Sequence, residues 1–448
     1  MNARSITVDF TKKCGKIKPL HAVSHGPRQK GVTLSRDISR EFLEIGIPAV
    51  RLHDIEYPYG SNQFVDIHCI FPDPSLDPEL PESYNFAPTD AYIRAIREVG
   101  SDIIFRLGES TDLFPRTLYT GAPRDIEKWA SVCEHVIMHY NEGWADGFKL
   151  NLRRFEICGG ADDARVFSGS QSEFFELYRI TANRLKERFP KIKIGGYGCG
   201  GFYALNRLSS TEEQKRYVPY LRAFLRYIAS PETSAPLDFF TWYSYPQTPE
   251  ELALHARYAR SILEECGHRR TQSVICGYNT PAFLSDDISD KPSYAAEFAS
   301  VLFSLQKSDV EYAVVSDNPA CASYGRTFLT RGGASEDCPL YHTLLMFGEL
   351  YKLGACSETL GDSRSEVYSL AASNGERHAL MLACRQYSGN IELRLTGCEA
   401  SSCRIRRIAS RDGYTSAVSA IGGELEVKGG RVAFRADKEA VYLLEFPR

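Results

Sequence analysis

Two apolar runs, Ile103-Ile-Phe-Arg-Leu107 and Phe155-Glu-Ile-Cys158, flank the amphipathic segment 124–141. Two short apolar runs with a helix-length segment between them form a strand–helix–strand unit. The alternation continues on both sides, with apolar runs at 19–23, 49–53, 192–195, 237–242, 273–276 and 312–315 and helical patterns at 35–46, 89–100, 172–188, 211–228, 249–266 and 294–306. Eight strands alternating with helices predict an α/β fold, a closed (β/α)8 TIM barrel over residues 17–354.

The pattern changes near Gly354. Short strands then follow one another without intervening helices, at 367–372, 378–384, 390–395, 403–408, 425–428, 431–435 and 441–446. Such a run of strands, some separated by Gly-rich turns, predicts a β-sandwich accessory domain over residues 355–448. Residues 1–16 can add a further strand to it.

Bulk composition excludes several classes of protein. The 448 residues carry a net charge of −4, which argues against a nucleic-acid partner. No apolar run approaches 18 residues, so we expect no membrane partner, and the first ten residues lack the apolar core of a signal peptide. The 13 cysteines are scattered and include no Cys-x-x-Cys pair, which favours buried free thiols in a cytoplasmic protein.

Active sites of such barrels lie at the carboxyl ends of the strands. The polar and aromatic residues expected there are His25, His53, Asp54, Arg106, Glu109, Asp162, Asp163, Tyr197, Trp242, Tyr243, Tyr245, Tyr278, Asn279 and Asp317. Flat aromatic faces with a few polar groups suit sugar rings, although any one of these aromatics could equally belong to the barrel core.

A set of motifs makes this pattern more specific. They include Gly46-Ile-Pro-Ala-Val-Arg-Leu-His-Asp54, Val65-Asp-Ile-His-Cys-Ile-Phe-Pro-Asp73, Glu142-Gly-Trp-Ala-Asp-Gly147, Leu237-Asp-Phe-Phe-Thr-Trp242 and Phe347-Gly-Glu-Leu-Tyr351. In order and spacing they resemble glycoside hydrolase family 39 and related clan A barrel glycosidases over roughly residues 17–355. The resemblance implies a carbohydrate ligand, with His53, Asp54, Arg106, Glu109, Trp242, Tyr243, Tyr245, Asn279 and Asp317 as substrate-binding candidates.

The two catalytic positions depart from the family pattern. The resemblance implies Trp-Asn-Glu-Pro after the fourth strand, where this chain has Cys158-Gly-Gly-Ala161, so that Gly160 stands in place of the general acid/base. It implies Glu-Trp-Asn at the seventh strand, where this chain has Gly277-Tyr-Asn279, so that Gly277 stands in place of the nucleophile. We expect the two glycines to face each other at the barrel mouth, beside a gap wide enough for water or a small anion.

A retaining glycosidase needs two carboxyl groups about 5 Å apart, and glycine supplies neither. Neighbouring carboxylates could substitute, namely Asp162 or Asp163 acting with Glu109 or Asp317, but each of these could instead cap a loop or form an ion pair. Cys276 should point toward the helices by strand alternation, whereas Cys158 has inward parity.

Two other signals do not develop into sites. Gly196-Tyr-Gly-Cys-Gly-Gly201 fits a dinucleotide fingerprint but lacks the later acidic residue, and His135 with His139 has no evident third metal ligand. We therefore expect no cofactor and no metal.

Three hypotheses of function remain. The first is a glycan-binding pseudoglycosidase without ordinary retaining activity. The second is an active β-glycosidase with relocated carboxylates. The third is a non-catalytic subunit, either a homo-oligomer or a partner of an active homologue.

Overall fold

A computed structural model describes most of the chain. The described residues are 3–30, 35–52, 64–109, 120–280, 291–316, 338–363, 366–410 and 418–447. None of the described helices is both long and apolar enough to cross a bilayer.

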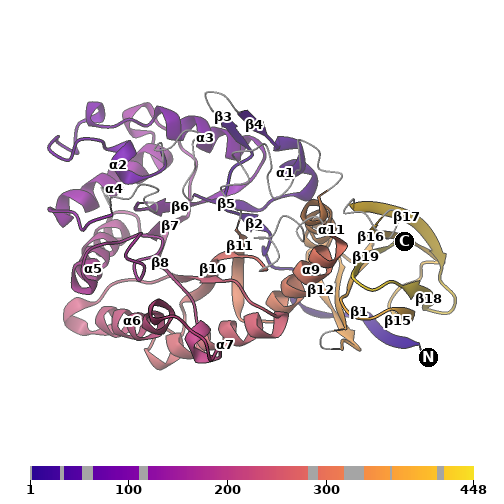
Figure 1. Ribbon diagram of the computed structural model, residues 1–448. Coiled ribbons are helices and arrows are strands. Elements are labelled where there is room, and N and C mark those ends of the chain that lie inside the picture. Colours follow the sequence, from indigo (N-terminus) through magenta and orange to yellow (C-terminus); the bar gives the residue numbers. More distant parts are fainter. Residues whose placement is uncertain are drawn as a thin grey trace.

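Eight parallel strands close into a barrel, which confirms the predicted fold class (Figure 1). In the order of the chain they are β2 (Ala22–Val23), β5 (Ala49–Arg51), β6 (Asp102–Leu107), β7 (Arg154–Ile157), β8 (Lys193–Cys199), β9 (Phe239–Ser244), β10 (Gln272–Tyr278) and β11 (Val310–Val315). The order around the barrel follows the chain, and β11 pairs with β2 to close it.

Helices surround the barrel. The longer ones are α1 (Ser39–Ile45), α3 (Ala87–Glu98), α4 (Ile126–Asn141), α5 (Gln171–Arg188), α6 (Glu212–Ala229), α7 (Pro249–Glu265), α9 (Pro292–Gln306) and α11 (Pro339–Leu353). Short elements are the hairpin β3 (Arg28–Lys30) and β4 (Ser35–Asp37), α2 (Ile67–Ile70), and the 3-10 turns η1 (Pro81–Ser83), η2 (Trp144–Asp146), η3 (Tyr203–Leu205) and η4 (Pro231–Thr233).

Side chains alternate between the barrel interior and the surrounding helices. On β9, Phe239 belongs to a small apolar cluster inside the barrel with Val274 and Tyr312. The next residue but one, Thr241, also faces inward, because consecutive side chains of a strand point to opposite faces. This alternation decides which strand-end residues can reach the mouth.

The remaining strands form one nine-stranded sheet, a nearly closed β-sandwich. They are β1 (Arg4–Lys16), β12 (Ala355–Leu360), β13 (Val367–Ser373), β14 (His378–Cys384), β15 (Gly389–Thr396), β16 (Ser402–Ser410), β17 (Val418–Glu426), β18 (Arg431–Ala436) and β19 (Ala440–Phe446). The amino-terminal β1 lies between β12 and β15, antiparallel to the first and parallel to the second. The division of the chain at residue 354 into two domains stays a prediction.

Helices α9 and α11 lie between the barrel and this sheet (Figure 1). Leu370, Met381 and Leu443, on β13, β14 and β19, are buried in the same hydrophobic core as the barrel and its helices. The opposite side chains of these strands, such as Leu380 and Leu444, belong to a separate core inside the sandwich.

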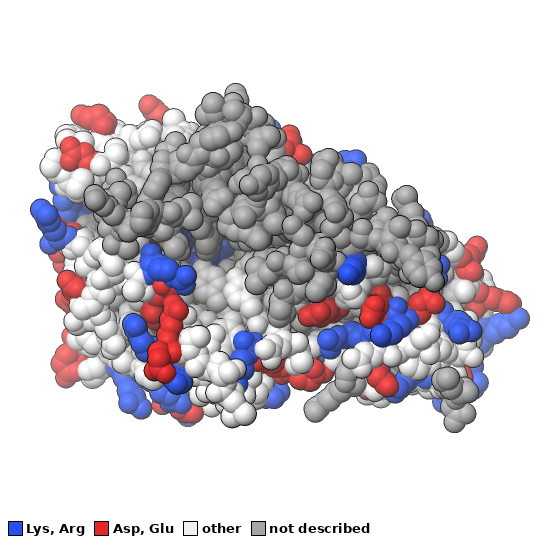
Figure 2. Space-filling model, viewed as in Figure 1, with Lys and Arg blue, Asp and Glu red and all other residues white. Residues whose placement is uncertain are grey.

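Basic and acidic side chains of the described residues are interspersed on the face shown in Figure 2. This mixture agrees with the small net charge of −4. It is unlike the clustered basic surface typical of nucleic-acid-binding proteins.

Candidate functional site at the barrel mouth

A buried polar network crosses the middle of the barrel. The Glu156 carboxylate accepts a hydrogen bond from Arg51 Nε at 2.6 Å and another from Thr241 Oγ1 at 2.6 Å. Thr241 Oγ1 in turn accepts a hydrogen bond from the backbone N–H of Gly198 at 2.7 Å. Burial lowers the pKa of Arg51, but the Glu156 carboxylate raises it more, so the pKa lies above its ordinary value. Arg51 therefore keeps its positive charge despite its burial.

Arg51 has a second edge that the network does not use. Its side chain is 1% exposed, and among the described residues no acceptor lies within hydrogen-bond distance of Nη1 or Nη2. The Tyr243 ring centroid lies 5.7 Å from Arg51 Cζ, which supplies only a weak cation–π attraction. A buried donor without a partner costs about 1–3 kcal/mol, so an acceptor placed at this edge would be stabilising.

Tyr243 connects the two glycine positions. Its hydroxyl donates a hydrogen bond to the Gly159 carbonyl at 3.0 Å, next to Gly160. A Cβ placed on Gly277 would lie 2.7 Å from the Tyr243 ring and 2.6 Å from Ser316 Oγ. Both glycine positions thus lie toward the carboxyl ends of their strands. The Tyr243 ring lies against Gly277, and its hydroxyl lies against Gly159, the neighbour of Gly160.

The expected gap at these glycines is closed. Besides the contacts of Gly277, a Cβ placed on Gly160 would lie 3.2 Å from a methyl group of Val166. Neighbouring side chains have taken the space, because a protein interior packs to near-crystalline density. The prediction of an open hole beside the glycines is therefore wrong at the level of the first side-chain atom.

Asp162 and Asp163 serve the loop after β7. Both oxygens of Asp162 accept from the backbone N–H of Gly200, at 3.2 and 3.1 Å, and its side chain is buried. Burial raises the pKa of Asp162 to about 7, against the lowering effect of that hydrogen bond. Asp163 pairs with Arg165, with 2.6 Å between the closest charged atoms. These contacts fit the alternative interpretation, in which Asp162 caps a loop and Asp163 forms an ion pair.

Glu109 is placed differently, on the wall of a cavity of about 710 Å³. The cavity lies between the loops after β5, β6 and β7 and helices α4 and α5, and Phe71, Trp129 and Phe167 contribute aromatic surface. Burial raises the pKa of Glu109 to about 7, although its partner His68 acts in the opposite direction. Burial lowers the pKa of His68, but its hydrogen bonds with Cys69 and with the accepting Glu109 carboxylate raise the pKa above its ordinary value.

Glu109 also belongs to a group of described side chains that lie close enough together to hold a metal ion. Candidate ligand atoms of Asp66, His68 and Glu109 lie within 4.8 Å of one another. Asp66 already forms an ion pair with Arg106, and His68 forms one with Glu109. Each of these two acidic side chains therefore already has a basic side chain as its partner.

Several predicted binding residues turn out to be structural. Trp242 packs against Phe202, with ring centroids 5.2 Å apart, and donates to Ser273 Oγ at 3.0 Å. It points toward the helices by strand alternation, so its predicted place in the mouth is wrong. Asn279 is buried and bonds to the Ser316 carbonyl and the Tyr294 hydroxyl.

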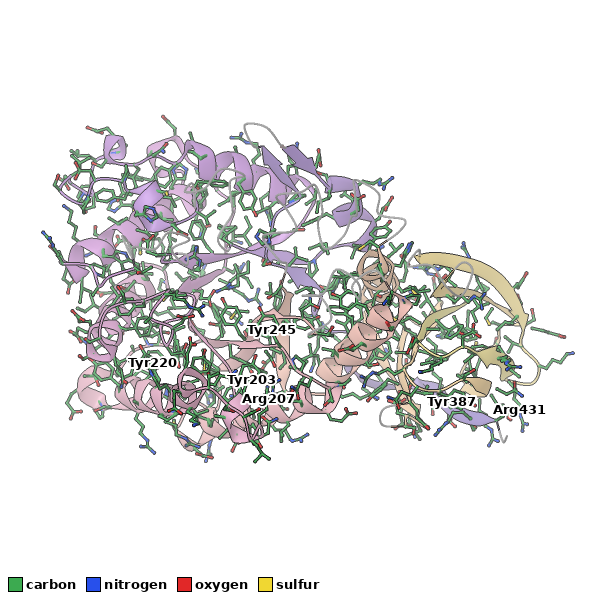
Figure 3. The ribbon with its side chains drawn as sticks, viewed as in Figure 1. Tyr203, Arg207, Tyr220, Tyr245, Tyr387 and Arg431 are labelled. Atoms are coloured by element: carbon green, nitrogen blue, oxygen red, sulfur yellow. The ribbon has the colours of Figure 1, made fainter. Side chains whose placement is uncertain are left out.

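Tyr245 is tied to the loop after β8. Its backbone N–H donates to the Tyr203 hydroxyl at 2.8 Å, and Arg207 donates to its carbonyl at 3.0 Å. Figure 3 labels these three residues, and Arg207 Cζ lies 4.4 Å from the centroid of the Tyr203 ring. The Tyr245 hydroxyl donates to Ser316 Oγ at 3.0 Å, beside Gly277. His53, Asp54 and Asp317 lie outside the described residues.

The prediction that Cys276 points toward the helices is wrong. Val274, two residues earlier on β10, lies in the cluster inside the barrel, so strand alternation directs Cys276 inward as well, and its thiol lies beside Arg51 and Tyr243. The pairing of β10 with β9 shifts register between Ile275 and Gly277, which is the mark of a β-bulge at Cys276, so the parity counted back from Gly277 does not hold. Burial raises the pKa of Cys276, so the thiol stays protonated and is a poor nucleophile. Burial likewise raises the pKa of Cys158, to about 11.

The signals set aside in the sequence have structural explanations. His135 bonds to the Ser131 carbonyl, and His139 bonds to Asp90 and to the Trp144 carbonyl. The glycine-rich segment begins within strand β8 of the barrel. Arg51 is the residue that sequence reasoning missed, although it had inward parity two positions before His53.

The two proteins described next resemble this chain in sequence, and each matches only part of it. No protein-family model matches the chain. A β-xylosidase of Geobacillus stearothermophilus is 20% identical over 278 residues, and one of Caldicellulosiruptor saccharolyticus is 22% identical over 260 residues. The matches cover 55% and 54% of this chain, and they span only about half of each relative, 51% and 46%.

Solved structures resemble the whole chain. A glucosidase from Croceicoccus marinus has a TM-score of 0.77 at 20% identity, with both chains covered completely. A β-xylosidase from Caulobacter crescentus has a TM-score of 0.72 at 16% identity, with 99% of each chain covered. A family 39 enzyme from Xanthomonas axonopodis has a TM-score of 0.69 at 15% identity, over 100% of this chain and 98% of that one. The chain has a family 39-like glycoside hydrolase fold. The two relatives in sequence named above are β-xylosidases.

Proposed function

We propose that this protein binds a carbohydrate at the mouth of its barrel without catalysing ordinary retaining hydrolysis. The observation that carries the proposal is the filling of both glycine positions, by Val166 at Gly160 and by Tyr243 and Ser316 at Gly277. The retaining mechanism needs a carboxylate at each of two points about 5 Å apart, and glycine supplies none at either position. Asp162 and Asp163 have other partners, which supports the same conclusion.

The ligand class follows from similarity and from the aromatic residues near the mouth. The relatives named β-xylosidase and the structure named glucosidase act on neutral sugars according to those names. Tyr243 and Tyr245 offer rings and hydroxyls of the kind that sugar sites use. Neutral xylose- and glucose-containing oligosaccharides are therefore the first ligands to test.

The test is a pair of measurements on the same preparation. We expect calorimetric binding of xylo-oligosaccharides or gluco-oligosaccharides, together with no release of nitrophenol from aryl β-xyloside or β-glucoside above the buffer rate. Loss of general acid catalysis alone slows such reactions about 10²–10⁴-fold, so the difference from an active relative will be large. Ready turnover by the wild-type protein would contradict the proposal.

A second candidate function is an active glycosidase with a relocated acid. The observation that favours it is Glu109, whose pKa of about 7 and position on a 710 Å³ cavity suit a general acid. Hydrolysis that disappears in Glu109→Gln and persists in Asp162→Asn would establish it. Hydrolysis lost in Asp162→Asn or Asp163→Asn would instead assign those carboxylates.

The third hypothesis, a non-catalytic subunit, makes a different prediction. It expects no glycan binding by the isolated chain and co-purification with an active homologue. Size-exclusion chromatography of the isolated protein and of a mixture with such a homologue distinguishes it from the first.

A further inference from the structure

The unused edge of Arg51 is a feature that the proposed carbohydrate site does not explain. Arg51 is the last residue of β5, so its guanidinium lies toward the carboxyl end of the barrel. One edge of the guanidinium is already hydrogen-bonded, because Nε donates to the Glu156 carboxylate at 2.6 Å. The other edge carries Nη1 and Nη2, which are buried and have no hydrogen-bond acceptor among the described residues.

The groups around that edge do not supply the missing acceptor. The Cys276 thiol lies beside Arg51, but burial raises its pKa, so it carries no charge. Tyr243 presents its ring, 5.7 Å away, while its hydroxyl donates to the Gly159 carbonyl. The glycine itself matters, because a Cβ at Gly159 would lie 3.0 Å from Arg51 Nη2. Glycine at position 159 therefore keeps side-chain atoms away from this end of the guanidinium.

The geometry of the unused edge selects its ligand. Two N–H groups of one guanidinium edge are parallel and match the two oxygens of a carboxylate, an arrangement that is stronger and more directional than a single hydrogen bond. A neutral hydroxyl group can accept from only one of them well. The ligand group that satisfies both donors at once is a carboxylate.

We propose that the Nη1–Nη2 edge of Arg51 binds a carboxylate, carried either by a small free acid of the size of formate or by an acidic sugar. This inference rests on the proposed function, because it names the chemistry of a ligand for the same barrel mouth. It differs from the anion expected in a gap beside Gly277. The space at the first side-chain atom of Gly277 is filled, and the donor here is a side chain on β5, three strands from β10 around the barrel.

A competing anion pocket exists at the opposite end of the barrel, and it provides the control. Arg97, Arg153, Arg154 and Lys193 line a cavity of about 320 Å³ together with Asp102. Arg154 stands on β7, as Glu156 does, but at the amino end of the strand. An anion bound nonspecifically to basic side chains would choose this exposed pocket rather than Arg51.

The experiment is calorimetric titration of the wild-type protein at constant ionic strength, with chloride as the background anion. The ligands are formate, glucuronate and, as its neutral counterpart, glucose. We expect at least one of the two carboxylates to bind, and glucose to bind at least about tenfold more weakly than the carboxylate that does. Binding by formate alone would identify a small free acid as the ligand, and tighter binding by glucuronate would identify an acidic sugar.

Two variants locate the site. Arg51→Lys keeps a positive charge for Glu156 but cannot present two parallel N–H groups, so we expect carboxylate binding to weaken about tenfold or more. Arg154→Lys is the matched control at the other end of the barrel and should bind as the wild type does. If Arg51→Lys does not fold, Arg51→Met combined with Glu156→Gln removes both charges together, and a wild-type crystal soaked in glucuronate needs no substitution.

Four results would overturn the inference. They are no binding of either carboxylate, equal affinity for glucose and the carboxylates, undiminished carboxylate binding by folded Arg51→Lys, and loss of binding in Arg154→Lys. Failure of the proposed function looks different, because it appears as failure to bind neutral oligosaccharides. A protein that binds xylo-oligosaccharides but neither carboxylate refutes only the inference about Arg51.

Discussion

The space beside Gly277 is taken by the Tyr243 ring and the Ser316 hydroxyl, at 2.7 and 2.6 Å from the position of a Cβ. Contacts this short require the neighbours to move, and overpacking of a buried site costs about 1–3 kcal/mol. We predict that Gly277→Ala lowers the free energy of unfolding by this amount in urea denaturation. The double change to Gly160→Glu and Gly277→Glu should be less stable still and should not restore hydrolysis.

The matched control for Gly277→Ala is Gly422→Ala in β17, where a Cβ would meet nothing within 4 Å. Its effect should stay within about 0.5 kcal/mol. Equal stabilities for the two alanine variants would show that the space at Gly277 is open after all.

Asp162 gives a prediction for the pH dependence of stability. Its pKa is raised from 3.8 to about 7 by burial, so the folded protein holds this proton more tightly than the unfolded chain does. The stabilisation from this group is complete below about pH 4 and is lost as the pH rises toward 7. Asp162→Asn should remove that part of the slope, which chemical denaturation at several pH values would measure. Parallel profiles for wild type and variant would assign the carboxyl an ordinary pKa.

At the scale of elements, β1 joins the beginning of the chain to the carboxyl-terminal sheet. Ile6 and Val8 are fully buried in the sandwich core, and the strand pairs on both sides. We predict that Ile6→Ala costs about 2–4 kcal/mol of stability, as large-to-small changes in a core do. Ser5→Ala, on the exposed position before it, is the control and should have little effect. A small loss for Ile6→Ala would mean that β1 contributes little to the core.

The local sequence pattern predicts most of the helices and strands, with some exceptions. All eight barrel strands coincide with predicted apolar runs, and seven predicted helices correspond to observed ones. Helix α11 was not predicted, because most of its residues are buried and it has no polar face to reveal the helical period. β12 was also missed, and β17 was predicted at 425–428 but lies at Val418–Glu426.

At the scale of the whole molecule, the barrel and the sandwich share a buried face. Leu370, Met381 and Leu443 of the sheet are buried in the core that includes α9 and α11. We predict that both parts unfold in one transition, because exposing either one uncovers this face of the other. All three tryptophans, Trp129, Trp144 and Trp242, lie in the barrel part, so their fluorescence follows that part alone.

The buried thiol of Cys384 reports on the sandwich core. Its rate of labelling in increasing urea should rise at the same midpoint as the change in tryptophan fluorescence. Two separate midpoints would mean that the parts unfold independently and that the shared face contributes little.

The amino-acid sequence alone predicts the barrel, because hydrophobic periodicity is local and eight repeats leave few alternatives. It also places glycines at positions 160 and 277, where the family resemblance expects glutamates. The contacts of these glycines form only in the folded chain, where Val166 approaches Gly160, and Tyr243 and Ser316 approach Gly277. The bulge at Cys276 and the pairing of Arg51 with Glu156, 105 residues apart, are likewise set by lateral strand pairing. Strand alternation gives parity along one strand, but the partners a side chain meets depend on register between strands, which no single segment encodes.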